Sequence, residues 1–301
     1  MFNTNHTPNI GEVEILREGL RVVTAPNASP MTFTGTRSYI VGEGEVAIVD
    51  PGPDDAKHFE ALTKALFGQR VSHILVTHSH IDHSPLAHRL SQAFDAPVFA
   101  FGESGAGMSE PMRLLAGQGG LAGGEGIDTN FKPDVLLQDS EEIRGVGWKM
   151  EAIHTPGHMS NHLCFAWEDS IFSGDHIMAW STTLVSPPDG DLTQFMSSLQ
   201  KLQGRSESIY YPGHGAPLIN AQKMLAHQFT HRKTREAQIL EEMNAGTVHQ
   251  ITSRIYTDLD HRLLPMAARN VFAHMIDLHQ RGIVRSQGAL AFDARFSLTK
   301  D

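Results

Sequence analysis

Four short apolar segments of this chain each end at residues that can bind a metal ion. The first, Val71–Thr77, is rich in β-branched residues and leads into the run His-Ser-His-Ile-Asp-His. Three later segments end in the same way, at His158, Asp175 and His214. Such runs predict buried β-strands. Because side chains from the carboxyl ends of neighbouring strands converge in α/β folds, the chain is constrained to a fold that brings these strand ends together.

The strand ends supply a ligand set for two ions. The candidate ligands are His78, His80, Asp82, His83, His158, Asp175 and His214. Neutral imidazole suits borderline metals such as zinc, and carboxylates offset the charge of the ions. We assign the ions as follows: His78, His80 and His158 to the first, Asp82, His83 and His214 to the second, and Asp175 as a bridge. The expected cofactors are two divalent ions, zinc first, with manganese or iron as alternatives.

This ligand set leaves an open position on each ion for a shared water. Two ions roughly 3.5 to 4 Å apart lower the pKa of such a water enough to supply hydroxide at neutral pH. That hydroxide is the expected nucleophile, and Asp82 is expected to steer its proton. A single histidine at a strand end is usually an ordinary core or surface residue, but seven matching positions favour a metal centre.

Three further residues are expected near the centre. His162 follows His158 by four residues and is expected to support the site or contact substrate rather than bind metal. Trp180 and Ser181 lie in the segment after the proposed bridge and are expected at the mouth of a pocket. Ordinary packing is the alternative for Trp180.

The sequence from His78 to His83 resembles the H-x-H-x-D-H signature of the metallo-β-lactamase superfamily, and the three later ligands match the family's later histidine, bridging aspartate and last histidine. The resemblance covers nearly the whole chain. It implies an αββα sandwich, in which two mixed sheets lie face to face, with helices outside and metals at one edge. Asp50 is similar to the family's early aspartate, which supports the metal loop through hydrogen bonds.

The departures from this family are informative. True β-lactamases of this type usually carry cysteine where this chain has Asp175, so we expect no efficient β-lactam hydrolysis. The related di-iron oxygen reductases have an acid in place of His80, which argues against that redox chemistry. Ser84 and Pro85 replace a common glycine. They leave the ligands intact and bear only on the geometry of the turn.

Local patterns agree with the sandwich. Strands are expected at 13–25, 38–41, 46–49, 71–76, 98–101, 148–154, 162–167, 170–173 and 209–211. Helices are expected at 54–67, 85–94 and 192–203, the second with Ser84 as its N-cap and Pro85 as its first residue. Residues 102–126 are rich in glycine. There we expect a short helix over 108–115, within either a mobile flap beside the site or a disordered surface insertion.

Beyond the last ligand, a long helix over 220–244 contains His-Arg-Lys-Thr-Arg-Glu at 231–236. This segment is similar to the subgroup called beta-lactamase-like protein two, which implies a C-terminal winged-helix domain. Thr247 is expected to cap a helix over 248–256, followed by a helix over 263–280 and a hairpin formed by 283–285 and 289–298. We therefore expect a catalytic domain over residues 1–220 and a helical linker with the winged helix over 221–301.

The basic residues of the long helix have two interpretations. Arg232, Lys233 and Arg235 are expected on a solvated helix face, with a local anion-binding patch as the alternative.

Composition sets further bounds. The chain has 301 residues, of which 40% are hydrophobic, enough for one large or two unequal domains. Its net charge of −10 disfavours tight nonspecific binding of nucleic acid. The single cysteine, Cys164, excludes a disulfide framework and is expected to be a small buried residue. Because there is no secretion signal and no apolar run near the roughly 20 residues that cross a bilayer, we expect a cytoplasmic protein without membrane association.

Together these features predict a dinuclear metal-dependent hydrolase that attacks a small-molecule ester or thioester with a hydroxide bridging the ions. The resemblance leaves open an alternative, endoribonuclease-type cleavage of phosphodiesters in single-stranded RNA. A non-catalytic metal-sensing protein is the alternative of another class, and it is disfavoured because a structural zinc is closed by four ligands. The expected partner is a small-molecule substrate, with RNA second, and a homodimer through the C-terminal domain is left open.

Overall fold

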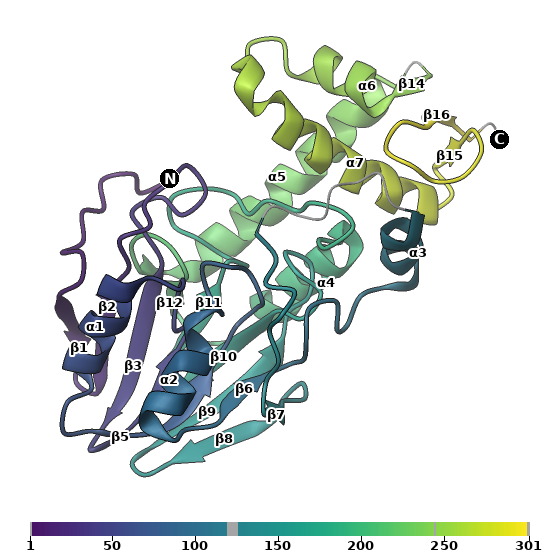
Figure 1. Cartoon of the computed structure of the whole chain (residues 1–301). Coiled ribbons are helices and arrows are strands. Elements are labelled where there is room, and N and C mark those ends of the chain that lie inside the picture. The colour runs from purple at the N-terminus through teal and green to yellow at the C-terminus, as the bar shows by residue number, and fades with distance from the viewer. Residues whose placement is uncertain (1, 119–125, 244, 300–301) are drawn as a thin grey trace.

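The computed structural model describes residues 2–118, 126–243 and 245–299. Two β-sheets lie face to face with helices outside, and a smaller C-terminal unit stands beyond one end of this sandwich (Figure 1). The strand order is β1-β2-β3-β4-β5-β6-β7 in the first sheet and β13-β12-β11-β10-β9-β8 in the second. The αββα sandwich expected from the sequence is confirmed.

The first sheet comes from the N-terminal half of the chain. Its strands are β1 (Val13–Arg17), β2 (Leu20–Thr24), β3 (Arg37–Glu43), β4 (Glu45–Val49), β5 (Arg70–Leu75), β6 (Val98–Ala100) and β7 (Val135–Leu136). Strands β1 to β4 are antiparallel and β4 to β7 are parallel, so the sheet is mixed. Helices α1 (Ala56–Ala65) and α2 (Leu86–Phe94) cover its outer face, where Leu62 and Leu90 pack against Ile48.

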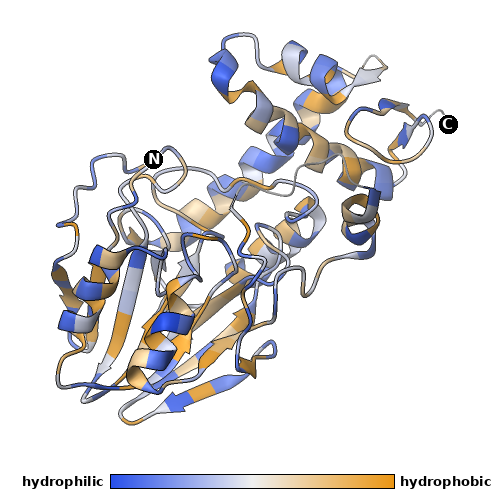
Figure 2. Ribbon diagram, in the orientation of Figure 1, coloured by the Kyte–Doolittle hydropathy of each residue, from blue (hydrophilic) through white to orange (hydrophobic). Residues whose placement is uncertain are grey.

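The second sheet follows from the middle of the chain. Its strands are β8 (Glu142–Gly145), β9 (Trp148–His154), β10 (Leu163–Trp167), β11 (Ser170–Gly174), β12 (Ile209–Pro212) and β13 (Leu218–Ile219). Helices α4 (Leu192–Gln203) and α5 (Ala221–Glu241) cover its outer face. Tyr39, Phe165 and Phe172 fill the space between the two sheets. Figure 2 shows that apolar residues dominate these strands, whereas the covering helices alternate between apolar and polar residues.

The C-terminal unit is a winged helix. It contains β14 (Gly246–Thr247), α6 (Val248–Ile255), the 3-10 helix η1 (His261–Leu263), α7 (Leu264–Gln280), β15 (Val284–Ser286) and β16 (Arg295–Leu298). The three strands form one sheet in the order β14-β16-β15. The Thr247 hydroxyl accepts from the Gln250 amide, while the Gln250 side chain accepts from the Thr247 amide, which fixes the start of α6 as the sequence predicted.

Helix α5 belongs to both cores. Met224 and Leu225 near its start pack against the second sheet, and Ile239 near its end packs in the C-terminal unit. The expected boundary at residue 220 falls just before this helix, whose residues contribute to the cores of both units. Within the described residues, neither α5 nor any other helix combines the length and the apolar character needed to cross a membrane.

Two local expectations were wrong. Residues 13–25 do not form one strand, because Gly19 adopts a φ of 68° and closes a hairpin between β1 and β2. Ser84 does not cap α2, whose N-cap is Pro85. The Ser84 hydroxyl donates instead to Asp128 Oδ2 at 2.8 Å, a partner that is distant in the sequence.

The basic residues of α5 also differ from expectation. Arg232 is only 3% exposed, so it lies neither on a solvated face nor in an open anion-binding patch. Lys233 is exposed and pairs with Glu236, and the Arg235 guanidinium lies 4.2 Å from the centre of the Tyr256 ring. The helix places Arg232 toward the sandwich, where α4 and α7 cover it.

The glycine-rich segment contains the expected short helix, α3 (Glu110–Gln118). Met112 and Leu115 of α3 pack in the core of the C-terminal unit. Residues 119–125, the middle of the expected flap or insertion, lie outside the described residues. The segment rejoins the site at Gly126, whose carbonyl accepts from the Ile81 amide at 2.6 Å.

Candidate metal centre

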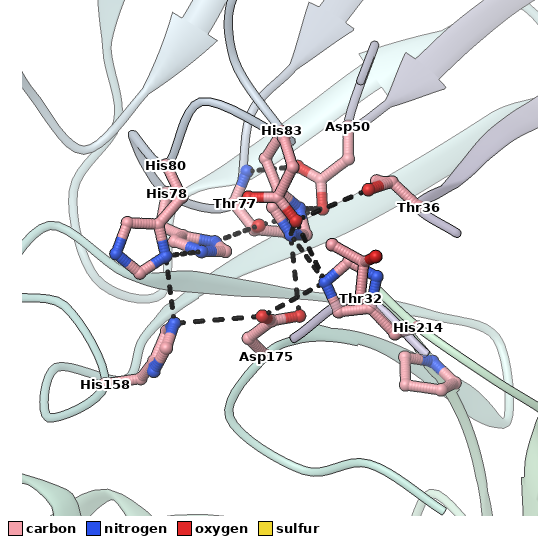
Figure 3. A network of polar contacts seen from close by, with 12 residues as sticks. Thr32, Thr36, Asp50, Thr77, His78, His80, His83, His158, Asp175 and His214 are labelled. Atoms are coloured by element: carbon pink, nitrogen blue, oxygen red, sulfur yellow. Dashed lines mark hydrogen bonds and ion pairs between the residues drawn. The ribbon is translucent and has the colours of Figure 1, made fainter. Parts of the chain in front are cut away.

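The seven expected ligands converge at one edge of the sandwich. Four of them lie in the turn between β5 and α2, and the others directly follow β9, β11 and β12: His78, His80, Asp82, His83, His158, Asp175 and His214. Figure 3 shows the labelled histidines and Asp175 pointing toward one another. Each strand is held in its sheet by neighbours, so the four strand ends present their side chains to a common point.

The first group consists of His78, His80 and His158. His78 Nε2 lies 2.9 Å from His80 Nδ1, and His158 Nε2 lies 3.1 Å from the same atom. All three ligand atoms lie within 4.8 Å of one another. Three imidazole nitrogens at this spacing fit one ion, which binds each nitrogen at about 2.0 to 2.1 Å when the ion is zinc.

The second group consists of Asp82, His83 and His214. His214 Nε2 lies 3.1 Å from Asp82 Oδ2 and 3.3 Å from His83 Nε2. These ligand atoms also lie within 4.8 Å of one another. The Thr36 hydroxyl donates to Asp82 Oδ2 at 3.4 Å and holds the carboxylate on this side of the site.

Asp175 lies between the two groups. Its Oδ2 is 3.3 Å from His214 Nε2 and 3.8 Å from His158 Nε2, and its Oδ1 is 3.5 Å from His83 Nε2. Within the described part of the chain, this buried Oδ1 accepts no hydrogen bond. Because a buried carboxylate oxygen without a donor is costly, this position fits a cation. The donor set is therefore compatible with divalent metal, and Asp175 lies within reach of both groups.

Asp50 orients the second group. Its Oδ2 lies 2.9 Å from His83 Nδ1 and accepts from the Thr77 hydroxyl at 2.8 Å, and its Oδ1 accepts from the Thr77 amide at 2.8 Å. A histidine that donates Nδ1–H leaves Nε2 free to bind metal. The Thr77 hydroxyl also lies 2.9 Å from His78 Nδ1, so one carboxylate orients a ligand in each group. This geometry agrees with the supporting role expected for Asp50.

The two groups differ in protonation when no ion is bound. Burial lowers the pKa of His80 to about 3, and burial together with the neighbouring histidines lowers that of His78. Burial acts in the same direction on His214, but the Asp175 and Asp82 carboxylates outweigh it and raise its pKa to about 9. The same carboxylates raise the pKa of His83 despite its burial. The first group therefore presents neutral imidazoles, whereas the second holds protons that an ion must displace.

The other expected site residues lie outside the open space. His162 is buried beneath His78, their ring centres 5.1 Å apart, and its Nδ1 lies 2.9 Å from the Thr155 hydroxyl. Trp180 stacks on Phe33 with ring centres 5.0 Å apart, and the Ser181 hydroxyl donates to the Thr182 carbonyl. None of His162, Trp180 and Ser181 is among the described residues that line the cavity, because each packs against its own neighbours.

A cavity of about 320 Å³ opens beside the ligands. Its walls come from four segments: the loop before β3, the turn between β5 and α2, the loop after β11 and the first turns of α7. The residues of these walls include Met31, Ile81, Leu184, Pro265, Met266 and Arg269. The Arg269 guanidinium donates to the Ser186 hydroxyl at 3.2 Å. Sequence reasoning missed Pro265, Met266 and Arg269, because no local pattern shows that α7 folds back over the site.

Comparisons with known proteins agree with this geometry. Residues 31–214 match the model of the metallo-beta-lactamase superfamily, and residues 247–293 match the beta-lactamase associated winged helix domain. The chain therefore belongs to the metallo-β-lactamase superfamily and carries that winged-helix domain. A beta-lactamase domain protein from Burkholderia ambifaria shares the fold, with a TM-score of 0.79 and 20% identity, over 98% of this chain and 96% of that chain.

Two curated relatives are similar to this chain. An atrochrysone carboxyl ACP thioesterase of Aspergillus fumigatus is 31% identical over 242 residues, which cover 77% of this chain and 67% of that protein. A beta-lactamase-like protein 2 homolog of Drosophila melanogaster is 30% identical over 277 residues, which cover 86% of this chain and 87% of that protein. These matches confirm the resemblance expected from the sequence. They identify the chain as a hydrolase of this superfamily, whose fold implies binding of divalent metal.

Proposed function

We propose that this hydrolase cleaves a thioester, or a related ester, with an apolar acyl group, and that two divalent ions bound by the two ligand groups drive the reaction. The observation that carries the proposal is the position of the cavity. His80, Asp82, His158, Asp175 and His214 line it, and the remaining lining combines apolar side chains with Ser29, Thr32, Ser186, Asp189 and Arg269. A substrate that fills this space presents its carbonyl to the ligand groups.

The cavity wall favours an apolar acyl group. Met31, Ile81, Leu184 and Met266 supply thioether and aliphatic surface next to the ligands. Arg269 is the one lysine or arginine among the described residues that line the cavity. RNA binding depends on neutralising many phosphates with clustered lysine and arginine, which this lining lacks. The relatives named as thioesterases favour a thioester over an oxygen ester.

When bound, the two ions would polarise the substrate carbonyl and lower the pKa of a water between them. We infer that Asp82 takes the proton of that water. Its side chain is 20% exposed and borders the cavity. In the metal-free site burial raises the pKa of Asp82, but the adjacent His83 and His214 outweigh burial and lower that pKa, so the carboxylate is ionised. Asp50 and Thr77 keep the histidine rings in place during turnover.

A substrate panel tests the proposal. Metal-free protein is loaded with zinc or manganese, its metal content is measured, and it is assayed against acyl thioesters of increasing length, aryl esters, a lactone, a phosphodiester and short single-stranded RNA. We expect two ions per chain and the highest kcat/KM for a thioester. A higher kcat/KM for RNA or the phosphodiester would replace the proposed substrate class. The Asp175→Asn variant is the control for contaminating hydrolases, because it keeps the shape of the side chain and removes the charge between the ions.

A further inference from the structure

Helices α5 and α7 hold the loop after β11 at Thr183. The Gln228 side-chain carbonyl accepts from the Thr183 amide at 3.4 Å, and the Arg232 guanidinium donates to the Thr183 carbonyl. Asn270 of α7 accepts from Arg232 at 3.0 Å and from the Val185 amide at 3.4 Å. The backbone at 183–185 is thus fixed by three side chains that follow the last metal ligand in the sequence.

The same short segment supports two proposed metal ligands. The single hydrogen of the Thr183 hydroxyl is shared between two backbone carbonyls, that of Asp175 at 2.8 Å and that of His176 at 2.9 Å. The Leu184 carbonyl accepts from His158 Nδ1 at 2.9 Å. Asp175 is the proposed bridge, and His158 belongs to the first group. A shift of residues 183–184 would therefore move one ligand of the first ion and the carboxylate between the ions.

Arg232 is the charged residue among these three side chains. It is 3% exposed, and its guanidinium lies 5.2 Å from the centre of the Phe195 ring. Its guanidinium donates to the Thr183 carbonyl and to the Asn270 amide oxygen, and both acceptors are neutral. Burying a guanidinium costs desolvation free energy, and an aliphatic side chain could fill the same space without that cost. Its rigid fork reaches two acceptors at once, which a hydrocarbon side chain does not do.

We propose that Arg232 is a positioning residue for the metal centre: through the Thr183 carbonyl it fixes the loop that orients Asp175 and His158. Helix α5 thereby couples the C-terminal unit to the geometry of the ligands. The inference rests on the proposed metal centre but not on the identity of the substrate. The inference gives Arg232, in the basic segment 231–236 of α5, a role in the interior of the protein.

The test compares four variants with the wild type. Arg232→Met keeps an unbranched apolar stem and removes the donors, and Arg232→Lys keeps one charged donor group. Thr183→Val keeps the shape and removes the hydroxyl that holds Asp175. Lys233→Met is the matched control, because Lys233 is the next residue of α5 and its side chain is 50% exposed. Ion affinity is measured by competition with a chromogenic chelator, and the visible spectrum of the Co²⁺-loaded protein reports ligand geometry.

We expect Arg232→Met and Thr183→Val to weaken ion binding by about 10- to 100-fold, the range usual for residues that orient metal ligands. The Co²⁺ spectrum should change, kcat should fall more than KM rises, and Arg232→Lys should recover part of the loss. Lys233→Met should match the wild type. The unfolding temperature of each metal-free variant separates positioning from loss of fold, and Thr183→Val keeps the test decisive if Arg232→Met unfolds.

Three results would overturn different claims. Unchanged ion affinity and an unchanged Co²⁺ spectrum in a folded Arg232→Met would refute the positioning role of Arg232, and the same result in Thr183→Val would refute the link from the loop to Asp175; either result leaves the metal centre intact. A wild-type protein that binds no ion would refute the proposed metal centre itself, and the positioning role with it.

Discussion

The substitution Asp50→Asn isolates the effect of one hydrogen-bond acceptor on the second ion. Asp50 has a φ of 54°, a left-handed conformation that asparagine also tolerates, so the backbone is not perturbed. The asparagine carbonyl can still accept from the Thr77 amide. Its NH₂ group, however, replaces the oxygen that lies 2.9 Å from His83 Nδ1 and 2.8 Å from the Thr77 hydroxyl. A donor then faces the His83 N–H.

The expected loss of ion affinity follows from the two N–H groups that would face each other. To accept from the new amide, His83 must carry its proton on Nε2, the nitrogen that faces Asp82, Asp175 and His214. A protonated Nε2 cannot bind metal. A hydrogen bond to a charged group contributes about 1.5 to 3 kcal/mol, which corresponds to a loss of about 10- to 150-fold in affinity for the second ion. The first ion loses less, because His78 is oriented through Thr77 rather than by Asp50 directly.

Zinc titration of the metal-free variant against a chromogenic chelator measures both affinities, and native mass spectrometry counts the ions. We expect one tightly bound and one weakened ion, with turnover restored in part by excess zinc. The unfolding midpoint of the metal-free protein serves as the control for fold. If Asp50→Asn binds both ions within threefold of the wild type, the orienting role derived for Asp50 is wrong.

Four further predictions follow. Between pH 6 and 8, affinity for the second ion should rise by about tenfold per pH unit for each displaced proton, because the pKa of His214 is about 9 in the metal-free site, whereas the first ion should respond little; a chelator titration at several pH values checks this, and equal slopes would contradict it. Met266→Ala should raise KM for long acyl chains more than for acetyl, since Met266 lines the cavity, and equal changes would argue against an acyl wall. Cys164 should resist alkylation at pH 8 until the protein unfolds, because burial raises the pKa of its thiol to about 12; labelling of the native protein would contradict this. Phe272→Ala should lower the free energy of unfolding by about 3 to 5 kcal/mol, measured by denaturant titration, because Phe272 is fully buried in the C-terminal core; a change below 1 kcal/mol would contradict that packing.

The sequence predicted those parts of the site in which a ligand lies close in the chain to the strand that positions it. The ligands follow apolar runs within a few residues, so strand and ligand are predicted from one short segment, as at Phe172 and Asp175. The hairpin at Gly19 was missed because the apolar pattern continues on both sides of the turn. The burial of Arg232 was missed because α4 and α7, distant in the sequence, decide which face of α5 is covered. Sequence reasoning also missed that Met266 lines the cavity, because α7 is distant in the sequence from the metal ligands.

The helix shared by the two units limits how this chain can be shortened. A fragment that stops at residue 220 would lack Met224 and Leu225 and leave apolar surface of the second sheet open to water. Uncovered apolar patches of this kind promote aggregation. A truncated form that keeps the metal ligands should therefore retain α5 and replace its last apolar turn, where Ile239 otherwise contacts the C-terminal core, with polar residues.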